Sequence, residues 1–185
     1  MIVWLSGPTG AGKTTFSGCF GQFGYAIVEE KIPSAEFQRF LTHPRDNCAR
    51  LQETIMRSRY RAWLRRSKSS HIVFDRSIDE DAAIFCRLHF EHGLLNRREY
   101  DRLKRLSRDL QKSMPKPDLI LFLTPGLDVL SSRLSSATHP KSIRSSLRQQ
   151  VHLYNDWICR RRESVIKVDD SACKVDSLRK VFRRA

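Results

Sequence analysis

Residues 7–14 read Gly-Pro-Thr-Gly-Ala-Gly-Lys-Thr and match the phosphate-binding loop pattern G-x-x-x-x-G-K-[ST] at every fixed position. An apolar run at 2–5 precedes the loop, and a stretch with helical spacing follows it. A strand, a glycine-rich turn and a helix in this order direct backbone N–H groups and the helix N-terminus at one point, where an anion binds. The segment therefore predicts a phosphate-loop α/β fold that binds a nucleoside triphosphate.

The loop also predicts which groups meet the triphosphate. Lys13 is expected to reach the β- and γ-phosphates, and the Thr14 hydroxyl is expected to bind Mg²⁺. ATP and Mg²⁺ are thus the predicted ligands, and a glycine-rich turn that matches by chance is the alternative. The residues expected to bind ATP are Gly7, Thr9, Gly10, Ala11, Gly12, Lys13, Thr14 and Thr15.

Apolar runs alternate with longer amphipathic stretches along the rest of the chain. Strands are predicted at 2–5, 25–28, 72–75, 119–124 and 165–168. Helices are predicted at 14–23, 46–68, 78–92, 96–114, 127–135, 144–161 and 175–184. This alternation predicts a three-layer sandwich, a five-stranded parallel sheet with helices on both faces, in a single domain spanning 1–185. Ligands are then expected beyond the carboxyl ends of the strands.

A serine-rich segment at 131–146 weakens the helical spacing and carries His139, Lys141 and Arg144. We interpret it as a short lid at about 135–148, whose cationic side chains close over a bound triphosphate. A solvated loop is the alternative interpretation.

The chain carries 34 Lys and Arg against 20 Asp and Glu, a net charge of +14. A basic surface that attracts a nucleotide is favoured over nucleic-acid binding, because no reading module or interleaved aromatic residues accompany the basic helices. No apolar run approaches the ~20 residues of a membrane span, and no removable targeting segment is expected. Five cysteines without a C-x-x-C pair predict reduced thiols and a cytoplasmic location.

Two strand ends carry acids. Asp75 closes an apolar run and is expected to hold the metal, directly or through water, with Arg76 beside it to pair with an anion. Glu29 and Glu30 close the second predicted strand, and one of them can act as a general base beside the γ-phosphate. Because neighbouring strand residues point to opposite faces, only one of the two can face the site.

One helical stripe carries candidate metal ligands. Cys86, His89 and His92 share helical spacing, which packing or exposure explains better than a metal site. We therefore predict no metal there.

In their order and spacing, these motifs resemble the deoxynucleoside kinase family, whose members transfer the γ-phosphoryl group of ATP to the 5′-hydroxyl of a deoxynucleoside. The resemblance covers most of the chain. It implies that Glu30 accepts the hydroxyl proton, that Arg76 holds the hydroxyl and the transferring group, and that Asp75 organises Mg²⁺. The segments that carry the resemblance are 7–15, 28–30, 75–85, 117–123, 127–130 with Arg133, and 153–158.

The resemblance also implies a nucleoside site. Gln52 and Arg59 fall where the family reads the base, and seven residues, two helical turns, place both on one helix face. Without the resemblance, a polar surface stripe is an equal alternative. Asp81 falls on the family's base-reading aspartate, and Phe85 is a further expected contact. An arginine donor beside an aspartate acceptor favours a purine deoxynucleoside or deoxycytidine over thymidine, whose O4 would face a second acceptor.

The chain departs from the family pattern at several positions. Lys31 replaces a proline after the base, and Leu41 stands where a tyrosine meets the 3′-hydroxyl. The lid lacks the family's paired arginines, and Arg144 is the expected substitute that stabilises the transferring phosphoryl group. Family members are commonly dimers through the paired helices after strands one and two. A homodimer is therefore one state that the resemblance allows, and the sequence itself does not report the oligomeric state.

Two rival functions remain open. A nucleoside monophosphate kinase of the thymidylate kinase type shares the fold and the Asp-Arg pair, although such enzymes usually carry an acid inside the loop, where residues 8–11 supply none. A catalytically idle, basic nucleic-acid-binding protein on a kinase scaffold is the second. It predicts salt-dependent binding without ATP turnover.

Overall fold

A computed structural model of the protein describes residues 1–29, 31–32, 34–135 and 145–169. The helix predicted at 175–184, most of the predicted lid, and the candidate residues Glu30 and Arg144 lie outside the described residues.

The five predicted strands form one parallel sheet in the order β2-β3-β1-β4-β5. Central β1 pairs with β3 on one side and with β4 on the other, so Leu5 aligns with Asp75 and with Leu121. The predicted sheet is confirmed, and the register brings the phosphate loop next to Asp75. The strands are β1 (Ile2–Ser6), β2 (Ala26–Val28), β3 (Ile72–Asp75), β4 (Leu119–Leu123) and β5 (Ser164–Val168).

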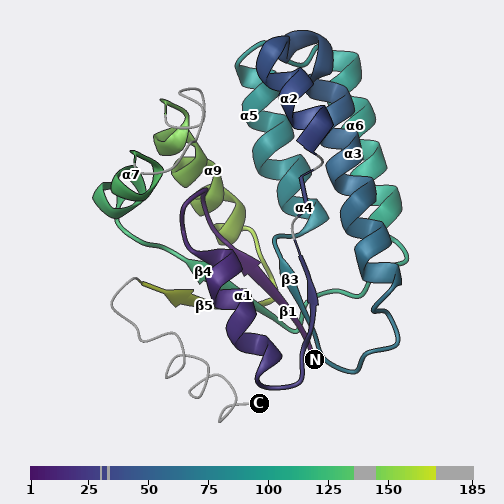
Figure 1. Cartoon of the computed structure of the whole chain (residues 1–185), viewed down its shortest axis with the longest axis vertical. Helices are drawn as coiled ribbons and strands as arrows, with labels where there is room; N and C mark the ends of the chain where they lie inside the picture. The colour runs from purple at the N-terminus through teal and green to yellow at the C-terminus, as the bar shows by residue number, and fades with distance from the viewer. Residues whose placement is uncertain (30, 33, 136–144, 170–185) are drawn as a thin grey trace.

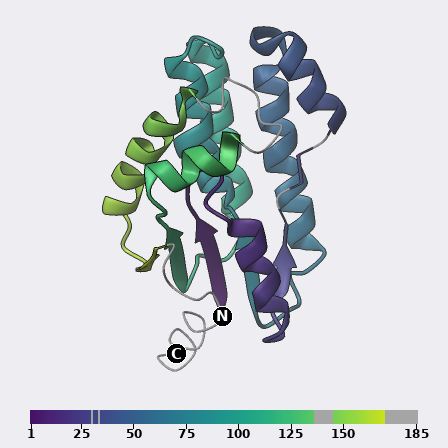
Figure 2. The ribbon, with the colours of Figure 1, turned by 60° about the vertical axis from the view of Figure 1, so that its left-hand side comes forward.

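The helices cover both faces of this sheet (Figure 1). In the views of Figures 1 and 2, α2 and α5 lie far from the N-terminus, at which β1 begins. The helices are α1 (Lys13–Gly21), α2 (Ser34–Thr42), α3 (Pro44–Leu64), α4 (Ile78–Glu80), the π-helix η1 (Asp81–Cys86), α5 (Arg87–Glu91), α6 (Arg97–Gln111), α7 (Leu127–Ser135) and α9 (Leu147–Cys159).

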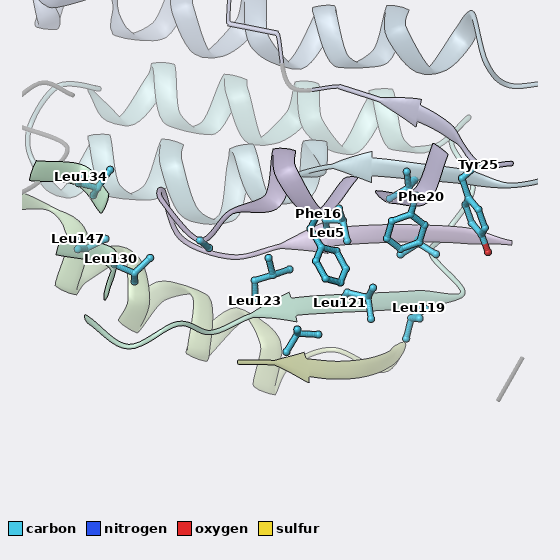
Figure 3. Packing of buried hydrophobic residues seen from close by; sticks show 14 residues of the cluster. Leu5, Phe16, Phe20, Tyr25, Leu119, Leu121, Leu123, Leu130, Leu134 and Leu147 are labelled. Carbon is cyan, nitrogen blue, oxygen red and sulfur yellow. The ribbon is translucent and has the colours of Figure 1, made fainter. Parts of the chain in front are cut away.

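Strand alternation divides the core into two layers. Val3 and Leu5 pack with α1 and α7, as Figure 3 shows for Leu5, Phe16 and Phe20. Trp4 points to the other face, where α3, η1 and α9 pack. A third apolar cluster joins α2, α3, η1 and α6 beside the sheet.

Helix α2 is absent from the sequence predictions. It spans only Ser34–Thr42, and a short helix gives few turns over which to recognise a period. Phe37, Phe40 and Leu41 nevertheless recur at i, i+3 and i+4 and pack in the third cluster. The helix predicted at 46–68 begins earlier, at Pro44, because proline suits the first helical turn.

The four cysteines that the structure describes are free thiols, at Cys19, Cys48, Cys86 and Cys159. Burial raises the pKa of the Cys48 thiol to about 12 and also raises the pKa of Cys86, so both stay protonated at neutral pH. Across 1–29, 31–32, 34–135 and 145–169, no helix combines the length and apolar character that crossing a bilayer requires.

Candidate functional site

The loop between β1 and α1 takes a backbone path that only glycine follows without strain. Gly7 has φ 149°, and a Cβ there would lie 2.7 Å from the Leu123 carbonyl oxygen. Gly12, directly before α1, has φ 87°. Both angles disfavour residues with side chains. The two glycines therefore shape the loop that precedes the positive N-terminal end of α1.

Lys13 lies against this loop as the first residue of α1. Its Nζ donates hydrogen bonds of 2.9 Å to the carbonyl oxygens of Gly7 and Pro8, and the residue is only 5% exposed. The arrangement keeps a buried positive charge at the helix N-terminus. An anion entering the loop would meet both the charge and the helix dipole.

Thr14 and Asp75, the two residues expected to hold the metal, lie in contact. The Thr14 hydroxyl donates to Asp75 Oδ2 at 2.7 Å, and Asp75 is almost fully buried at the end of β3. Its Oδ1 is a buried acceptor without a hydrogen-bond partner in the described part of the chain. Such an oxygen beside a hydroxyl fits a hard cation such as Mg²⁺.

Few other protein ligands surround this pair. Within the described ranges, no group of three or more His, Cys, Asp or Glu side chains gathers as a metal site. Mg²⁺ commonly binds through one or two protein oxygens together with water and substrate phosphates. Thr14 and Asp75 fit a Mg²⁺ site of this kind, in which two protein oxygens are joined by water and phosphate oxygens.

Arg76 adopts a strained backbone next to Asp75. Its φ of 70° lies in the left-handed region, which costs a residue other than glycine about 1–2 kcal/mol. Its N–H donates to the Leu5 carbonyl at 3.1 Å, its Nη1 donates to the Tyr154 hydroxyl at 2.6 Å, and its guanidinium lies 4.3 Å from the Phe85 ring centroid. Strain held by surrounding contacts is common at functional sites.

Arg59, on α3, contacts the turn formed by Asp75 and Arg76. Its Nη1 donates to the carbonyl oxygens of Asp75 and Arg76 at 2.7 and 3.1 Å. Its Nε and Nη2 donate to Asp81 Oδ2 and Oδ1 at 3.0 and 3.2 Å, and the residue is 2% exposed. Arg59 thus fixes both the turn that carries Asp75 and the orientation of the Asp81 carboxylate.

A cavity of about 510 Å³ joins these groups, a volume suited to a small-molecule ligand. The phosphate loop, α2, α3, η1, α5 and α9 all line it. Among the expected residues that the structure describes, those lining it are Thr9, Gly10, Gly12, Lys13, Thr14, Thr15, Gln52, Arg76, Asp81 and Phe85. Those that do not line it are Gly7, Ala11, Arg59 and Asp75.

His89 and Gln150 also line the cavity. From the sequence, His89 is only a rejected candidate metal ligand, and Gln150 is not a candidate. Burial, followed by the nearby His92, lowers the pKa of His89 to about 4, so its imidazole is neutral at pH 7. Its spacing of four from Phe85 and eight from Asp81 places all three on one helical stripe, which is a signal that the sequence does contain.

Gln150 ties α9 to the phosphate loop. Its Oε1 accepts hydrogen bonds from the Thr9 backbone N–H at 3.2 Å and from the Thr9 hydroxyl at 3.0 Å. Its Nε2 donates to the Ser146 hydroxyl at 3.1 Å. No local sequence pattern indicates a contact over 141 residues.

Breaking the buried Arg59–Asp81 pair is expected to destabilise the protein strongly. Asp81→Asn removes a charged hydrogen-bond partner from the buried Arg59 guanidinium, and we expect the free energy of unfolding to fall by about 3 kcal/mol. Urea unfolding measures the change. Asp101→Asn, which breaks the exposed Arg97–Asp101 pair, is the control and should change stability little. If Asp81→Asn and Asp101→Asn had the same free energy of unfolding, the buried Arg59–Asp81 pair would not stabilise the fold as proposed.

Curated relatives share sequence with most of the chain. The deoxyadenosine kinase of Dictyostelium discoideum is 30% identical over 160 residues, which is 83% of this chain and 63% of that protein. This chain therefore spans less than two thirds of the length of that relative. The deoxyguanosine kinase of Bacillus subtilis strain 168 is 23% identical over 154 residues, 81% of this chain and 74% of that protein.

Solved structures share the fold. The deoxyadenosine kinase from M. mycoides with bound dCTP superposes with a TM-score of 0.85 at 16% identity, and the match covers 100% of both chains. The same enzyme with bound dATP gives a TM-score of 0.82, covering 100% of this chain and 98% of the other. A family sequence model described as deoxynucleoside kinase matches residues 3–182. The chain therefore belongs to the deoxynucleoside kinase family.

Proposed function

We propose that this protein is an ATP-dependent deoxynucleoside kinase, which transfers the γ-phosphoryl group of ATP to the 5′-hydroxyl of a deoxynucleoside. The observation that carries the proposal is that one cavity is lined both by the phosphate loop and by Gln52, Asp81 and Phe85. Such a cavity can hold a phosphoryl donor and an acceptor together, and phosphoryl transfer depends chiefly on this positioning. The family membership supports the same reaction.

Under this proposal the loop and the α1 N-terminus bind the triphosphate of ATP, and Lys13 neutralises charge on its β- and γ-phosphates. Thr14 and Asp75 would hold Mg²⁺, which supplies further positive charge to the phosphates. Arg76, held beside the loop, would orient the transferring group and the attacking hydroxyl.

Two proposed roles rest on the sequence motifs, because the residues lie outside the described ranges. Glu30 is proposed as the general base that accepts the 5′-hydroxyl proton. Arg144 is proposed as the lid cation that stabilises charge on the transferring phosphoryl group. Arg144 would add positive charge to that of Lys13 and Arg76, and Glu30 would supply the proton acceptor.

The cavity wall supports a preference among nucleobases. Asp81 is an acceptor whose orientation Arg59 fixes, and the Gln52 amide can both donate and accept. Adenine, guanine and cytosine each offer an N–H donor to such a carboxylate, whereas thymine places its O4 acceptor where cytosine has a donor. We therefore propose that a purine deoxynucleoside or deoxycytidine is preferred over thymidine.

Transfer of labelled phosphate from ATP to a nucleoside panel tests this function. The panel contains the four deoxynucleosides, their ribose forms and their monophosphates, each with and without Mg²⁺. We expect at least one of deoxyadenosine, deoxyguanosine and deoxycytidine to exceed thymidine by about 10-fold in kcat/KM, since a mismatched buried acceptor costs about 1–3 kcal/mol. Chelation of Mg²⁺ should stop transfer. Transfer confined to monophosphates would instead identify a nucleoside monophosphate kinase.

A further inference from the structure

A buried carboxylate that the proposed reaction does not use lies beside Arg76. Glu80, the last residue of α4, is 0% exposed. Its Oε2 accepts hydrogen bonds from the Ser6 hydroxyl at 3.0 Å, the Ser77 N–H at 2.8 Å and the Ser77 hydroxyl at 3.0 Å. Its Oε1 accepts from the Tyr154 hydroxyl at 3.0 Å. One side chain therefore connects the end of β1, the turn after β3 and helix α9.

Tyr154 carries this connection to Arg76. Its hydroxyl donates its single proton to Glu80 and accepts the 2.6 Å hydrogen bond from Arg76 Nη1. The ring is fully buried, stacked on Phe122 at 5.9 Å between centroids and edge-on to Trp157 at 6.3 Å. Packing therefore fixes the phenol, and Glu80 fixes the direction in which its proton points.

The chemistry of the network suits a carboxylate. The Glu80 side chain is the acceptor in all four of these hydrogen bonds, and an ionised carboxylate can accept on both of its oxygens. Burial raises the pKa of Glu80, whereas Arg76, the Ser77 hydrogen bonds and Lys13 act in the opposite direction. A glutamine in its place would turn an NH₂ group toward either Tyr154 or the two serines, so at least one existing donor would lose its acceptor.

Helix capping alone does not account for these contacts. Ser77 and Glu80 form a capping box, and Asn96 and Glu99 form a second one at the start of α6. In the described part of the chain, the hydrogen bonds of the second box join its own two residues, Asn96 and Glu99, and lie at the exposed surface. Glu80 adds bonds to Ser6 and Tyr154, which come from other elements. The pair of boxes thus offers a matched comparison.

We propose that Glu80 and Tyr154 are positioning residues that orient the Arg76 guanidinium in the cavity wall. The kinetic part of this inference rests on the proposed kinase function and deepens it. Arg59 bonds the backbone carbonyls of the strained turn, whereas the Tyr154 hydroxyl accepts a hydrogen bond from the Arg76 side chain itself. The orientation itself is a property of the folded chain and can be measured without any turnover.

The kinetic experiment compares Tyr154→Phe and Glu80→Gln with two controls. Tyr60→Phe removes a hydroxyl bonded to Ser113, and Glu99→Gln alters the second capping box. We expect kcat to fall about 10-fold or more in the first two variants with both KM values within about twofold, because misplacement of a group that acts on the transition state lowers turnover. The controls should keep the wild-type kcat. Wild-type kcat in Tyr154→Phe, or a raised KM at unchanged kcat, overturns the proposal.

Nitrogen-15 NMR of the arginine side chains tests the orientation directly. Arg76 should give separate signals for its two Nη groups in the wild type, assigned by their loss in Arg76→Lys, and these signals should merge in Tyr154→Phe and Glu80→Gln. Separate signals that persist in both variants overturn the proposal, whether or not the protein transfers phosphate. If the signals merge while the wild type phosphorylates nothing in the nucleoside panel, the proposed function fails and the positioning network stands.

Discussion

Replacing Lys13 by alanine is expected to lower kcat by about 100- to 1000-fold, the range for removing one preorganised charge-stabilising donor. The Lys13 ammonium is held within the loop by the Gly7 and Pro8 carbonyls, at the N-terminus of α1. Without it, the loop amides remain but the full positive charge beside the β- and γ-phosphates is lost. Steady-state transfer of labelled phosphate to the best nucleoside of the panel measures the effect.

The Lys13 experiment needs a control for the loss of a lysine. Lys112→Ala removes an exposed lysine that pairs with Asp109 on the protein surface, and it should keep the wild-type kcat. Thermal unfolding of both variants should remain cooperative, since the Gly7 and Pro8 carbonyls can accept hydrogen bonds from water once the lysine is gone. Normal turnover in Lys13→Ala would remove the loop from the proposed mechanism.

The sheet could be predicted because each of its strands has a recognisable local sequence pattern. Residues 72–74 and 119–123 are continuous apolar runs, as expected of parallel strands buried on both faces, and each strand ends near a turn or an acid. The phosphate loop needed only its own spacing. Asp75 was proposed as a metal ligand from its place at the end of a buried strand, and in the structure it accepts a hydrogen bond from the Thr14 hydroxyl.

The surroundings of Arg76 could not be predicted in the same way. The sequence around Arg76 contains no signal that an arginine adopts a left-handed backbone. The side chains that contact Arg76 come from the distant positions 59, 85 and 154. Helical spacing predicted that Gln52 and Arg59 lie on one face of a helix, and α3 carries both residues. The spacing could not reveal that the two residues have different surroundings. Arg59 donates hydrogen bonds to the carbonyl oxygens of a turn distant in sequence, whereas Gln52 lines the cavity.

The same physical limit explains why Glu80 escaped notice. Ser77 and Glu80 have the spacing of a capping box, which the sequence predicts only as the start of a helix. The contacts with Ser6 and Tyr154 each span 74 residues and exist only once β1, α4 and α9 pack together. Local patterns thus predict the groups expected to bind phosphate, while tertiary packing decides how the groups around Arg76 are oriented.

Replacing Glu30 by glutamine is expected to lower kcat by about 100- to 10,000-fold, the usual contribution of a general base. The candidate bases at this strand end are Glu29 and Glu30. Glu29 is exposed and forms a 3.4 Å ion pair with Lys31, itself exposed, so the structure favours a surface role for Glu29 and leaves Glu30 as the proposed base. The amide of glutamine can hold a hydroxyl but cannot take its proton, so the KM for ATP should change little.

Glu29→Gln is the matched control, because it makes the same chemical change one residue away and should keep the wild-type kcat. Measuring both variants across pH adds a second readout. Wild type and Glu29→Gln should lose turnover as the pH falls and the base becomes protonated, whereas the residual turnover of Glu30→Gln should lack that acid limb. Full turnover in Glu30→Gln, or a large loss in Glu29→Gln, would assign the base elsewhere.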